Sequence, residues 1–425
     1  MTAFMVSLAA DRALPASATP PGIAQIQRGL MWAVGAGGAI VFIEPSPYEI
    51  ATLAALVFFY ATGLRMRPAF VPLVILLFML NIGYTVCSIH LMDRSEIVNW
   101  IMTSWYMAVT AFLFAMVLAE DTAERLEFLR RGLIVGALIA SLAGIAGYFH
   151  LVPGRIYDLF TLYNRARGTF KDPNVLGAFL ILPALFLLQS VVTQTFWKSF
   201  KSTIALGIVS LAILLAFSRA SWGMLIGCSA FMIVLMYLTS PSQAQRSRIV
   251  TTAIAAAICA MVLLAILLSF DSVDQLFKQR ASFSQSYDSG RFGRFGRHAL
   301  GFQMALDLPW GIGPLQFNRF FPEDTHNSFL NAFMSGGWIS GICFPALTFT
   351  TVIIGFKLIF VRVPWQLPYL AVFSAFVGTV CEAFIIDVDH WRHFWMMLGM
   401  MWAMFAAAHV YIHAHKRAQQ ARSSG

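Results

Sequence analysis

Four short stretches of this chain combine arginine, histidine or asparagine with glycine or serine. The stretches are R-G-T-F-K-D-P-N at 167–174, F-S-R-A-S at 217–221, S-G-R-F-G-R at 289–294 and T-H-N-S-F-L at 325–330. Guanidinium groups match phosphate oxygens with paired hydrogen bonds, and a histidine titrates near neutral pH. These residue types could therefore hold an anionic phosphate and move a proton beside it.

Membrane-spanning helices are the elements that must position these stretches. The 425-residue chain is 59% hydrophobic and 12% charged, and its mean hydropathy is +0.72. A soluble chain carries about 25% charged residues, whereas apolar runs of about 18 residues or more are typical of bilayer spans. Only helices and closed barrels satisfy their backbone in lipid, and the apolar runs here are continuous rather than alternating. We therefore predict an all-α integral membrane protein with a single membrane domain.

About twelve transmembrane helices are expected, with a long loop segment between the ninth and the tenth. They centre on residues 28–43, 48–62, 68–89, 97–118, 132–149, 174–192, 202–217, 222–238, 249–270, 338–360, 367–386 and 394–411. The membrane domain then covers 28–411, with tails at 1–27 and 412–425. The N-terminal stretch is polar, contains three prolines and lacks the apolar core of a signal peptide, so we expect a loose tail.

Basic residues in the short connections indicate the orientation. Arginine or lysine follows each even-numbered span up to the tenth and recurs in the C-terminal tail, which places these residues on one side. The positive-inside rule makes that side the cytoplasm, with both termini there. The opposite side receives two long segments, 150–173 and 271–337, and the short connection after span seven. These contain the four stretches, so any chemistry is expected on the outer face.

The two long outer segments are unusually basic for that side of a membrane. They contain Arg155, Arg165, Arg167, Lys171, Lys278, Arg280, Arg291, Arg294, Arg297 and Arg319. A solvated loop, or attraction to anionic membrane lipids, would explain the charge. A pocket for a phosphorylated lipid would explain it more specifically, because arginine pairs with phosphate. Nucleic acid is not expected as a partner, since the basic residues lie between apolar spans.

The order of these motifs resembles the O-antigen ligase and polysaccharide polymerase superfamily of bacterial inner membranes. An R-G-x-F-x-x-P-N motif is followed by an S-R hairpin and then by a long outer loop. That loop carries S-G-R, then P-x-G-x-G at 309–313, then H-N-x-x-L at 326–330, and glycines at 336, 337 and 341. The resemblance covers 167–341, and the twelve expected spans extend it over the chain.

The resemblance implies glycosyl transfer at the periplasmic face of the inner membrane, as in lipopolysaccharide biosynthesis. The donor would be a glycan linked to undecaprenyl diphosphate. A ligase transfers that glycan to lipid A–core, which is the reading we favour, whereas a polymerase transfers it to another lipid-linked repeat unit.

Carried over by motif, His326 matches the family's essential histidine, and Arg167 and Arg219 match arginines that hold the diphosphate. One further family arginine has three candidates, Arg291, Arg294 and Arg297, and the distance to Pro309 favours Arg294. Asn174, which could cap the next helix, and Asn327 are expected as supporting residues.

Elementary chemistry agrees with this assignment. Fixed guanidinium groups stabilise the charge that develops on a leaving diphosphate without a metal or another cofactor. A histidine suits the general base that takes the acceptor's proton. Direct attack opposite the leaving group predicts an inverting glycosyltransferase.

Two competing interpretations remain open. Asp387, Asp389, His390 and His393 resemble a metal cluster, although a solvated turn is the expected structure there. A lipid-linked glycan transporter would share the basic pocket, but it should show charges in midmembrane and internal repeats. The predicted spans contain little beyond Glu382, which lies near an end.

Overall fold

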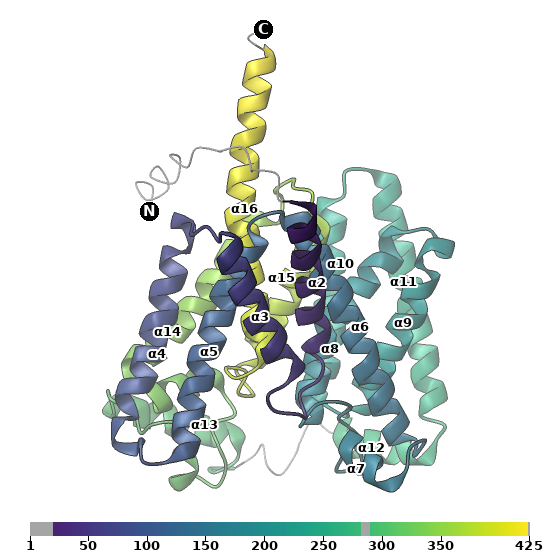
Figure 1. Cartoon of the computed structure of the whole chain (residues 1–425). Coiled ribbons are helices and arrows are strands. Elements are labelled where there is room, and N and C mark those ends of the chain that lie inside the picture. The colour runs from purple at the N-terminus through teal and green to yellow at the C-terminus, as the bar shows by residue number, and fades with distance from the viewer. Residues whose placement is uncertain (1–19, 282–289, 424–425) are drawn as a thin grey trace.

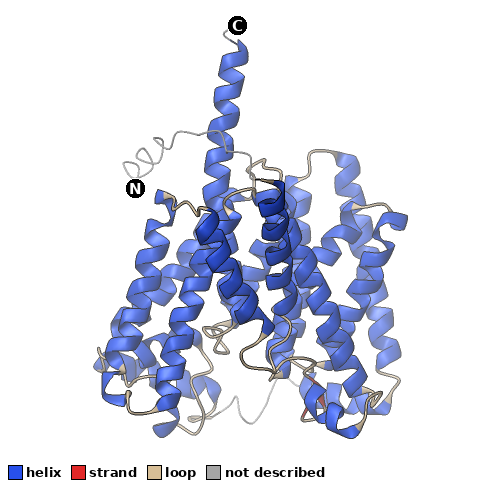
Figure 2. Cartoon of the chain, in the orientation of Figure 1, coloured by secondary structure: helices blue, strands red, loops and turns tan. Residues whose placement is uncertain are grey.

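The protein is a bundle of long helices with short loops at both ends (Figures 1 and 2). The computed structural model describes residues 20–281 and 290–423. Outside that part lie residues 1–19, which form most of the predicted N-terminal tail, and Ser289 of the S-G-R motif.

Nine helices in the described part are long and apolar enough to cross a membrane, which confirms an all-α membrane protein. They are α4 (Val71–Cys87, with η2, Pro68–Phe70, before it), α5 (Ser95–Leu118), α6 (Thr122–Tyr148), α8 (Pro173–Thr193), α9 (Phe196–Leu215), α10 (Arg219–Thr239), α11 (Gln243–Leu267), α14 (Ser328–Leu358) and α16 (Arg392–Ser423).

Three shorter helices occupy the other predicted spans. They are α2 (Pro21–Gly37), α3 (Pro47–Thr62) and α15 (Gln366–Glu382), with 17, 16 and 17 residues. About 17–25 residues cross a bilayer, so twelve spans stay a prediction. Helix α2 begins within the segment predicted as a tail, and α16 continues as one helix through most of 412–425.

The short elements of the outer segments lie together at one end of the bundle. They are α7 (Gly154–Phe160), β1 (Thr161–Leu162), β2 (Arg165–Ala166), α12 (Asp271–Ala281), α13 (Arg294–Asp307) and η4 (Phe317–Arg319). Strands β1 and β2 form an antiparallel pair in which Thr161 faces Ala166. Figure 1 shows α7, α12 and α13 at the end opposite to the start of α2 and the last turns of α16. A further turn, η3 (Ile89–Leu91), links α4 to α5.

Burial distinguishes the central helices from the peripheral ones. In its most apolar stretch, α8 is 89% buried, whereas α11 is only 6% buried. Helix α8 packs against α9, α10 and α15. Because α11 is the most apolar of these stretches and yet is hardly covered, its side chains face the surroundings, as expected of a helix in contact with lipid.

Helix α14 is broken at its two adjacent glycines. Gly337 adopts φ +59° and ψ −159°, which side chains with a Cβ rarely adopt. The P-W-G-I-G loop packs into the break: Ile312 N donates to Met334 O at 2.7 Å, and Trp338 N donates to Pro309 O at 2.9 Å. A Cβ on Gly337 would lie 2.3 Å from Pro309 O. The first two turns of α14 are therefore separated from the long part, which begins at Trp338, where the tenth span was predicted.

Candidate functional site

A cavity of about 1080 Å³ lies between α10 and α15, where they meet the outer segments. Its lining includes Arg165, Arg219, Arg280, Arg294 and His326, which come from five different parts of the chain. We call this space the outer cavity. It brings together two of the predicted arginines, Arg219 and Arg294, with the predicted histidine, and the predicted Asn174 also lines it.

The outer cavity also has a deep apolar part. Helix α10 lines it from Arg219 to Phe231, twelve residues or about 18 Å along the helix axis. Met224 and Gly227 line it between those ends, and Val377 and Gly378 line it from α15. The cavity thus has two parts. The cationic chamber is lined by the four arginines at the ends of the helices. The apolar shaft is lined by Met224, Gly227, Phe231, Val377 and Gly378 and lies between α10 and α15.

His326 is held by the loop that connects α15 to α16. Its backbone N–H donates to Asp387 Oδ2 at 3.0 Å, and the N–H of Asn327 donates to Asp387 Oδ1 at 3.0 Å. Thr325 Oγ1 donates to the same carboxylate at 3.0 Å. On the other side, His298 of α13 contacts Thr325 O through Nε2 at 2.9 Å. His326 itself has φ +45°, a left-handed conformation that these contacts maintain.

The electrostatic surroundings keep the His326 imidazole neutral. Burial, followed by the positive charge of Arg294, lowers the pKa of His326 below its ordinary value of 6.5. A neutral imidazole at neutral pH can accept a proton, which is the state that a general base requires.

Asn327, which was predicted as a supporting residue, caps the helix that follows the predicted histidine. It is the N-cap of α14, and its Oδ1 accepts the Leu330 N–H at 3.0 Å. Its Nδ2 donates to Phe384 O at 3.0 Å, so the same side chain ties α14 to the end of α15. The residue beside His326 therefore fixes the start of α14.

The acidic turn after α15 is a buried structural connection, and the expectation of a solvated turn was wrong. Asp389 is 3% exposed and accepts from Asn331 Nδ2 at 2.9 Å. Burial, followed by the negative charges of Asp389 and Asp324, raises the pKa of Asp387. Across residues 20–281 and 290–423, no three His, Cys, Asp or Glu side chains are arranged to hold a metal ion. Packing against the H-N motif, which sequence cannot show, buries these carboxyl groups.

Arg219 is the first residue of α10, at the tip of the α9–α10 hairpin. Phe217 turns the chain with φ +47°, and Ser218 caps α10 by accepting the Ser221 N–H at 3.4 Å. Arg219 thus lines the outer cavity at the positive end of the α10 dipole, which also favours an anion.

Arg167 does not line the outer cavity. Its guanidinium donates to the backbone carbonyls of Asp158 at 2.7 Å and Leu159 at 3.2 Å, and to that of Lys171 at 3.3 Å. Nearby, Lys171 pairs with Glu44, and Thr169 Oγ1 donates to Ala39 O. The R-G-T-F-K motif therefore closes its own loop and docks it on the α2–α3 connection.

Arg165, two residues earlier, lines the outer cavity instead. It is 7% exposed, and it donates from Nε to Ala216 O at 2.7 Å and from Nη2 to Asn174 Oδ1 at 2.8 Å. Asn174 does not cap α8; Asp172 does, by accepting the Asn174 N–H at 2.7 Å. Asp172 precedes Pro173, which takes the first helical position, so the cap lies two residues earlier than predicted.

Only one of the three arginines around 291–297 lines the outer cavity. Arg294 does so from the first residue of α13. Arg291 stacks on Phe292, with its guanidinium carbon 5.7 Å from the ring centre, and it is outside the lining. Arg297 is 2% exposed and pairs with Glu323 at 2.6 Å. The spacing argument from Pro309 selected the arginine that faces the cavity.

Three charged residues of the outer cavity were not predicted as site residues: Arg165, Arg280 and Glu382. Arg165 and Arg280 were visible only as members of the basic outer segments, without a motif. Glu382 was visible as the acid within a predicted span, a signal of function in membrane proteins. Burial and orientation, rather than residue type, distinguish these three from their neighbours.

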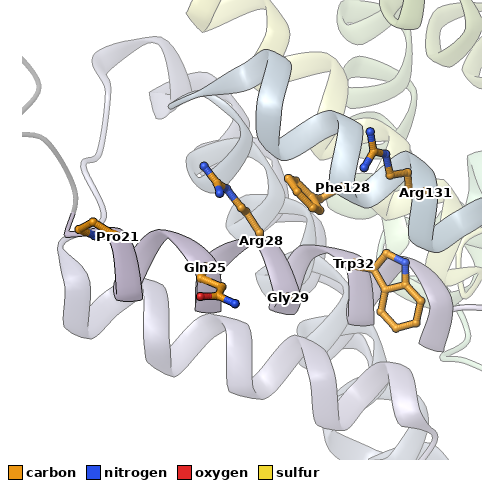
Figure 3. A pocket seen from close by; sticks show the side chains of 7 residues that line it. All are labelled: Pro21, Gln25, Arg28, Gly29, Trp32, Phe128 and Arg131. Atoms are coloured by element: carbon orange, nitrogen blue, oxygen red, sulfur yellow. The ribbon is translucent and has the colours of Figure 1, made fainter.

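A second, smaller cavity lies at the opposite end of the bundle, between the first turns of α2 and α6 (Figure 3). It has a volume of about 660 Å³, and Arg28, Trp32, Phe128 and Arg131 line it. The guanidinium carbons of Arg28 and Arg131 lie 5.9 and 5.6 Å from the Phe128 ring centre. We call this space the α2–α6 groove.

Comparison of the chain with protein-family models and with curated proteins finds no match.

Proposed function

We propose that this protein transfers a glycan from undecaprenyl diphosphate to a lipid A–core acceptor at the periplasmic face of the bacterial inner membrane. The observation that carries the proposal is the outer cavity, where four arginines and one histidine converge above an apolar shaft. A diphosphate with a polyprenyl tail has the matching form, since its anionic group needs guanidinium partners and its tail needs an apolar surface.

The arginines bind the donor and stabilise the leaving group. As the bond between the sugar and the diphosphate oxygen breaks, its electron pair remains on that oxygen. Arg219 and Arg294, which line the outer cavity from the first residues of α10 and α13, stabilise this charge together with Arg165 and Arg280. Fixed charges in a site partly shielded from water act without reorganisation during the step, and this is an efficient form of electrostatic catalysis.

His326 acts as the general base in the same proposal. Its neutral imidazole takes the proton of the acceptor hydroxyl, whose oxygen attacks the anomeric carbon as the diphosphate leaves from the opposite side. The proton then passes from His326 to solvent. This is a single displacement with inversion, it forms no covalent bond between sugar and protein, and it involves no metal. Asp387 is a positioning residue, because it holds the backbone on both sides of the imidazole.

The proposed orientation places both termini in the cytoplasm. Basic side chains support it at the end of the bundle where α2 starts: Arg28 pairs with Glu124 at the start of α6, and Arg67 donates to Ala119 O after α5. Reporter fusions at Arg130 and Arg248 are expected to indicate cytoplasm, and one at Asp158 periplasm. An inversion at any of these points would contradict the proposed site.

The decisive experiment is transfer by the purified protein in proteoliposomes. Undecaprenyl-diphosphate-linked glycan and lipid A–core are supplied together, and the products are separated on a gel. The expected product is glycan joined to lipid A–core, formed in excess chelator. Longer carrier-linked chains without lipid A–core would identify a polymerase. Movement of intact donor between leaflets, without either product, would identify a transporter.

A further inference from the structure

Glu382, the last residue of α15, has a position in the outer cavity that neither the motifs nor the proposed catalytic groups explain. It lines the cavity, yet the residue is only 3% exposed. Neither of its carboxyl oxygens has a hydrogen-bond partner within residues 20–281 and 290–423. Burial of a polar group without a partner is costly, so a buried carboxyl group of this kind on a cavity wall points to a partner in the bound ligand.

Helix packing sets the depth of Glu382. Gly378 of α15 lies against α10, where an added Cβ would come within 2.2 Å of Cys228 Sγ. Cys228 lies nine residues beyond Arg219, about 13 Å along α10. Glu382 lies four residues from Gly378 toward the outer end of α15, a return of about 6 Å. Its backbone is therefore about 7 Å deeper than Arg219, at the junction of the cationic chamber and the apolar shaft.

The chemical form of the group follows from this position. A buried carboxyl group without a cation beside it costs less free energy when it is protonated. A protonated carboxyl donates one O–H and accepts through its other oxygen. The ligand group at this level must therefore have a hydrogen-bond acceptor, and it must lie between a part that binds arginines and a part that fills an apolar shaft.

We propose that Glu382 donates a hydrogen bond to the phosphate nearest the lipid in a polyprenyl diphosphate. This inference rests on the proposed function and adds a donor-binding residue to it. The arginines above contact the phosphate nearest the sugar, and Glu382 contacts the one attached to the hydrocarbon. Ser374, two turns deeper on α15, lines the shaft where the first isoprene units lie.

The experiment measures binding of farnesyl diphosphate and of inorganic phosphate to the purified full-length protein by titration calorimetry. Glu382→Leu removes the hydrogen-bond donor and replaces the carboxyl side chain with an apolar one of similar size. Glu382→Gln keeps a donor, because its amide N–H₂ can replace the O–H. Cys381→Ala is the matched control, since Cys381 lines the same wall.

Glu382→Leu is expected to weaken farnesyl diphosphate binding at least about tenfold, as loss of a hydrogen bond to a charged group does. Glu382→Gln and Cys381→Ala are expected to stay within about threefold of the unchanged protein. Inorganic phosphate, which has only the group that the arginines hold, should bind all four proteins equally. Thermal stability of Glu382→Leu should be equal or higher, because a buried unpartnered polar group is removed; a structural role predicts lower stability.

Three other results would contradict the inference, its hydrogen-bond role or the proposed function. If the unchanged protein binds farnesyl diphosphate and Glu382→Leu binds it equally well, Glu382 has no part in donor binding, although the proposed function stands. If Glu382→Gln is as weak as Glu382→Leu, the carboxyl group acts as an anion or transfers a proton, and the hydrogen-bond role is wrong. If the unchanged protein binds neither probe, both the inference and the proposed function fail.

Discussion

The outer cavity and the α2–α6 groove both contain arginines, but the two differ in what surrounds those arginines. In the groove, Arg28 pairs with Glu124 at 2.5 Å and Arg131 pairs with Glu127 at 2.7 Å. In the outer cavity, four arginines share the described lining with a single carboxyl group, that of Glu382. Both arginines of the groove thus pair with a glutamate of α6, and Glu127 also pairs with Arg130 at 2.7 Å.

The two sites also differ in how far apart in the sequence their residues lie. Two helices supply the groove, and in α6 both glutamates lie within a few residues of Arg131. Close glycine contacts hold these helices together: a Cβ on Gly132 would lie 2.1 Å from Trp32 O. The residues of the outer cavity come from segments between Arg165 and Ile386. The groove is therefore a local contact between two helices, whereas the outer cavity is assembled from distant parts of the chain.

The largest effect is expected for His326→Ala. The loss of a general base should reduce turnover by roughly 10²–10⁴-fold, while donor binding changes little. Turnover and donor affinity of the purified variant are the two measurements. A fall of less than about tenfold would exclude the base role, and a parallel loss of donor binding would make His326 a binding residue.

Next in size are Arg219→Ala and Arg294→Ala, with Arg28→Ala from the groove as the matched control. Removal of a charged hydrogen-bond donor costs about 1.5–3 kcal/mol, or roughly ten- to a hundredfold in donor affinity. Arg28→Ala should leave donor affinity unchanged. Equal losses in all three variants would show that net charge, rather than the outer cavity, attracts the donor.

Arg165 and Arg167 provide a sharper comparison within one loop. Arg165→Lys should weaken donor binding, because lysine lacks the guanidinium fork that also contacts Ala216 O and Asn174 Oδ1. Arg167→Lys should mainly lower the melting temperature, since three backbone carbonyls lose their donor. Donor affinity and melting temperature of both variants are measured together. A larger binding loss in Arg167→Lys would restore the motif-based assignment.

A smaller effect concerns the pH dependence of His326. Its pKa is lowered from 6.5 by burial and then by Arg294, so it stays neutral, and active as a base, to a pH below 6.5. Arg294→Gln removes a positive charge, so the pKa of His326 should rise and the acidic loss of reactivity should begin at higher pH. The pH dependence of His326 reactivity is measured by diethyl pyrocarbonate labelling of the peptide that contains His326, followed by mass spectrometry. Arg291→Gln, outside the lining, should show no shift.

The smallest effect is expected in the groove. Exposed ion pairs contribute about 0–1 kcal/mol, and the side chains of Arg28 and Glu124 are 44% and 46% exposed. Arg28→Ala should therefore lower the melting temperature slightly and leave transfer at its original rate. A loss of transfer comparable to that of Arg219→Ala would mean that the groove has a function of its own.

Much of the fold could be predicted from the sequence, because hydropathy and helix breakers are local properties. All twelve predicted spans contain a helix, and the long part of α14 begins at Trp338, directly after the two glycines. The one-sided distribution of the short basic loops stays a prediction, because it depends on the number of spans. Helix ends were less predictable: Asp172 rather than Asn174 caps α8, since Pro173 occupies the first helical position.

The sequence by itself determined which residue types are present and in which order, and that order singled out His326, Arg167, Arg219, Arg291 and Arg294. Tertiary structure alone decided which of them share a cavity. Arg165 and Arg167 have the same chemistry two positions apart, yet only Arg165 lines the outer cavity. Asp387 holds the His326 loop from 61 positions away, and Glu382 is buried without a partner in the described part. The physical reason is that burial and pairing depend on distant segments packed against a side chain, whereas hydropathy depends on the side chain itself.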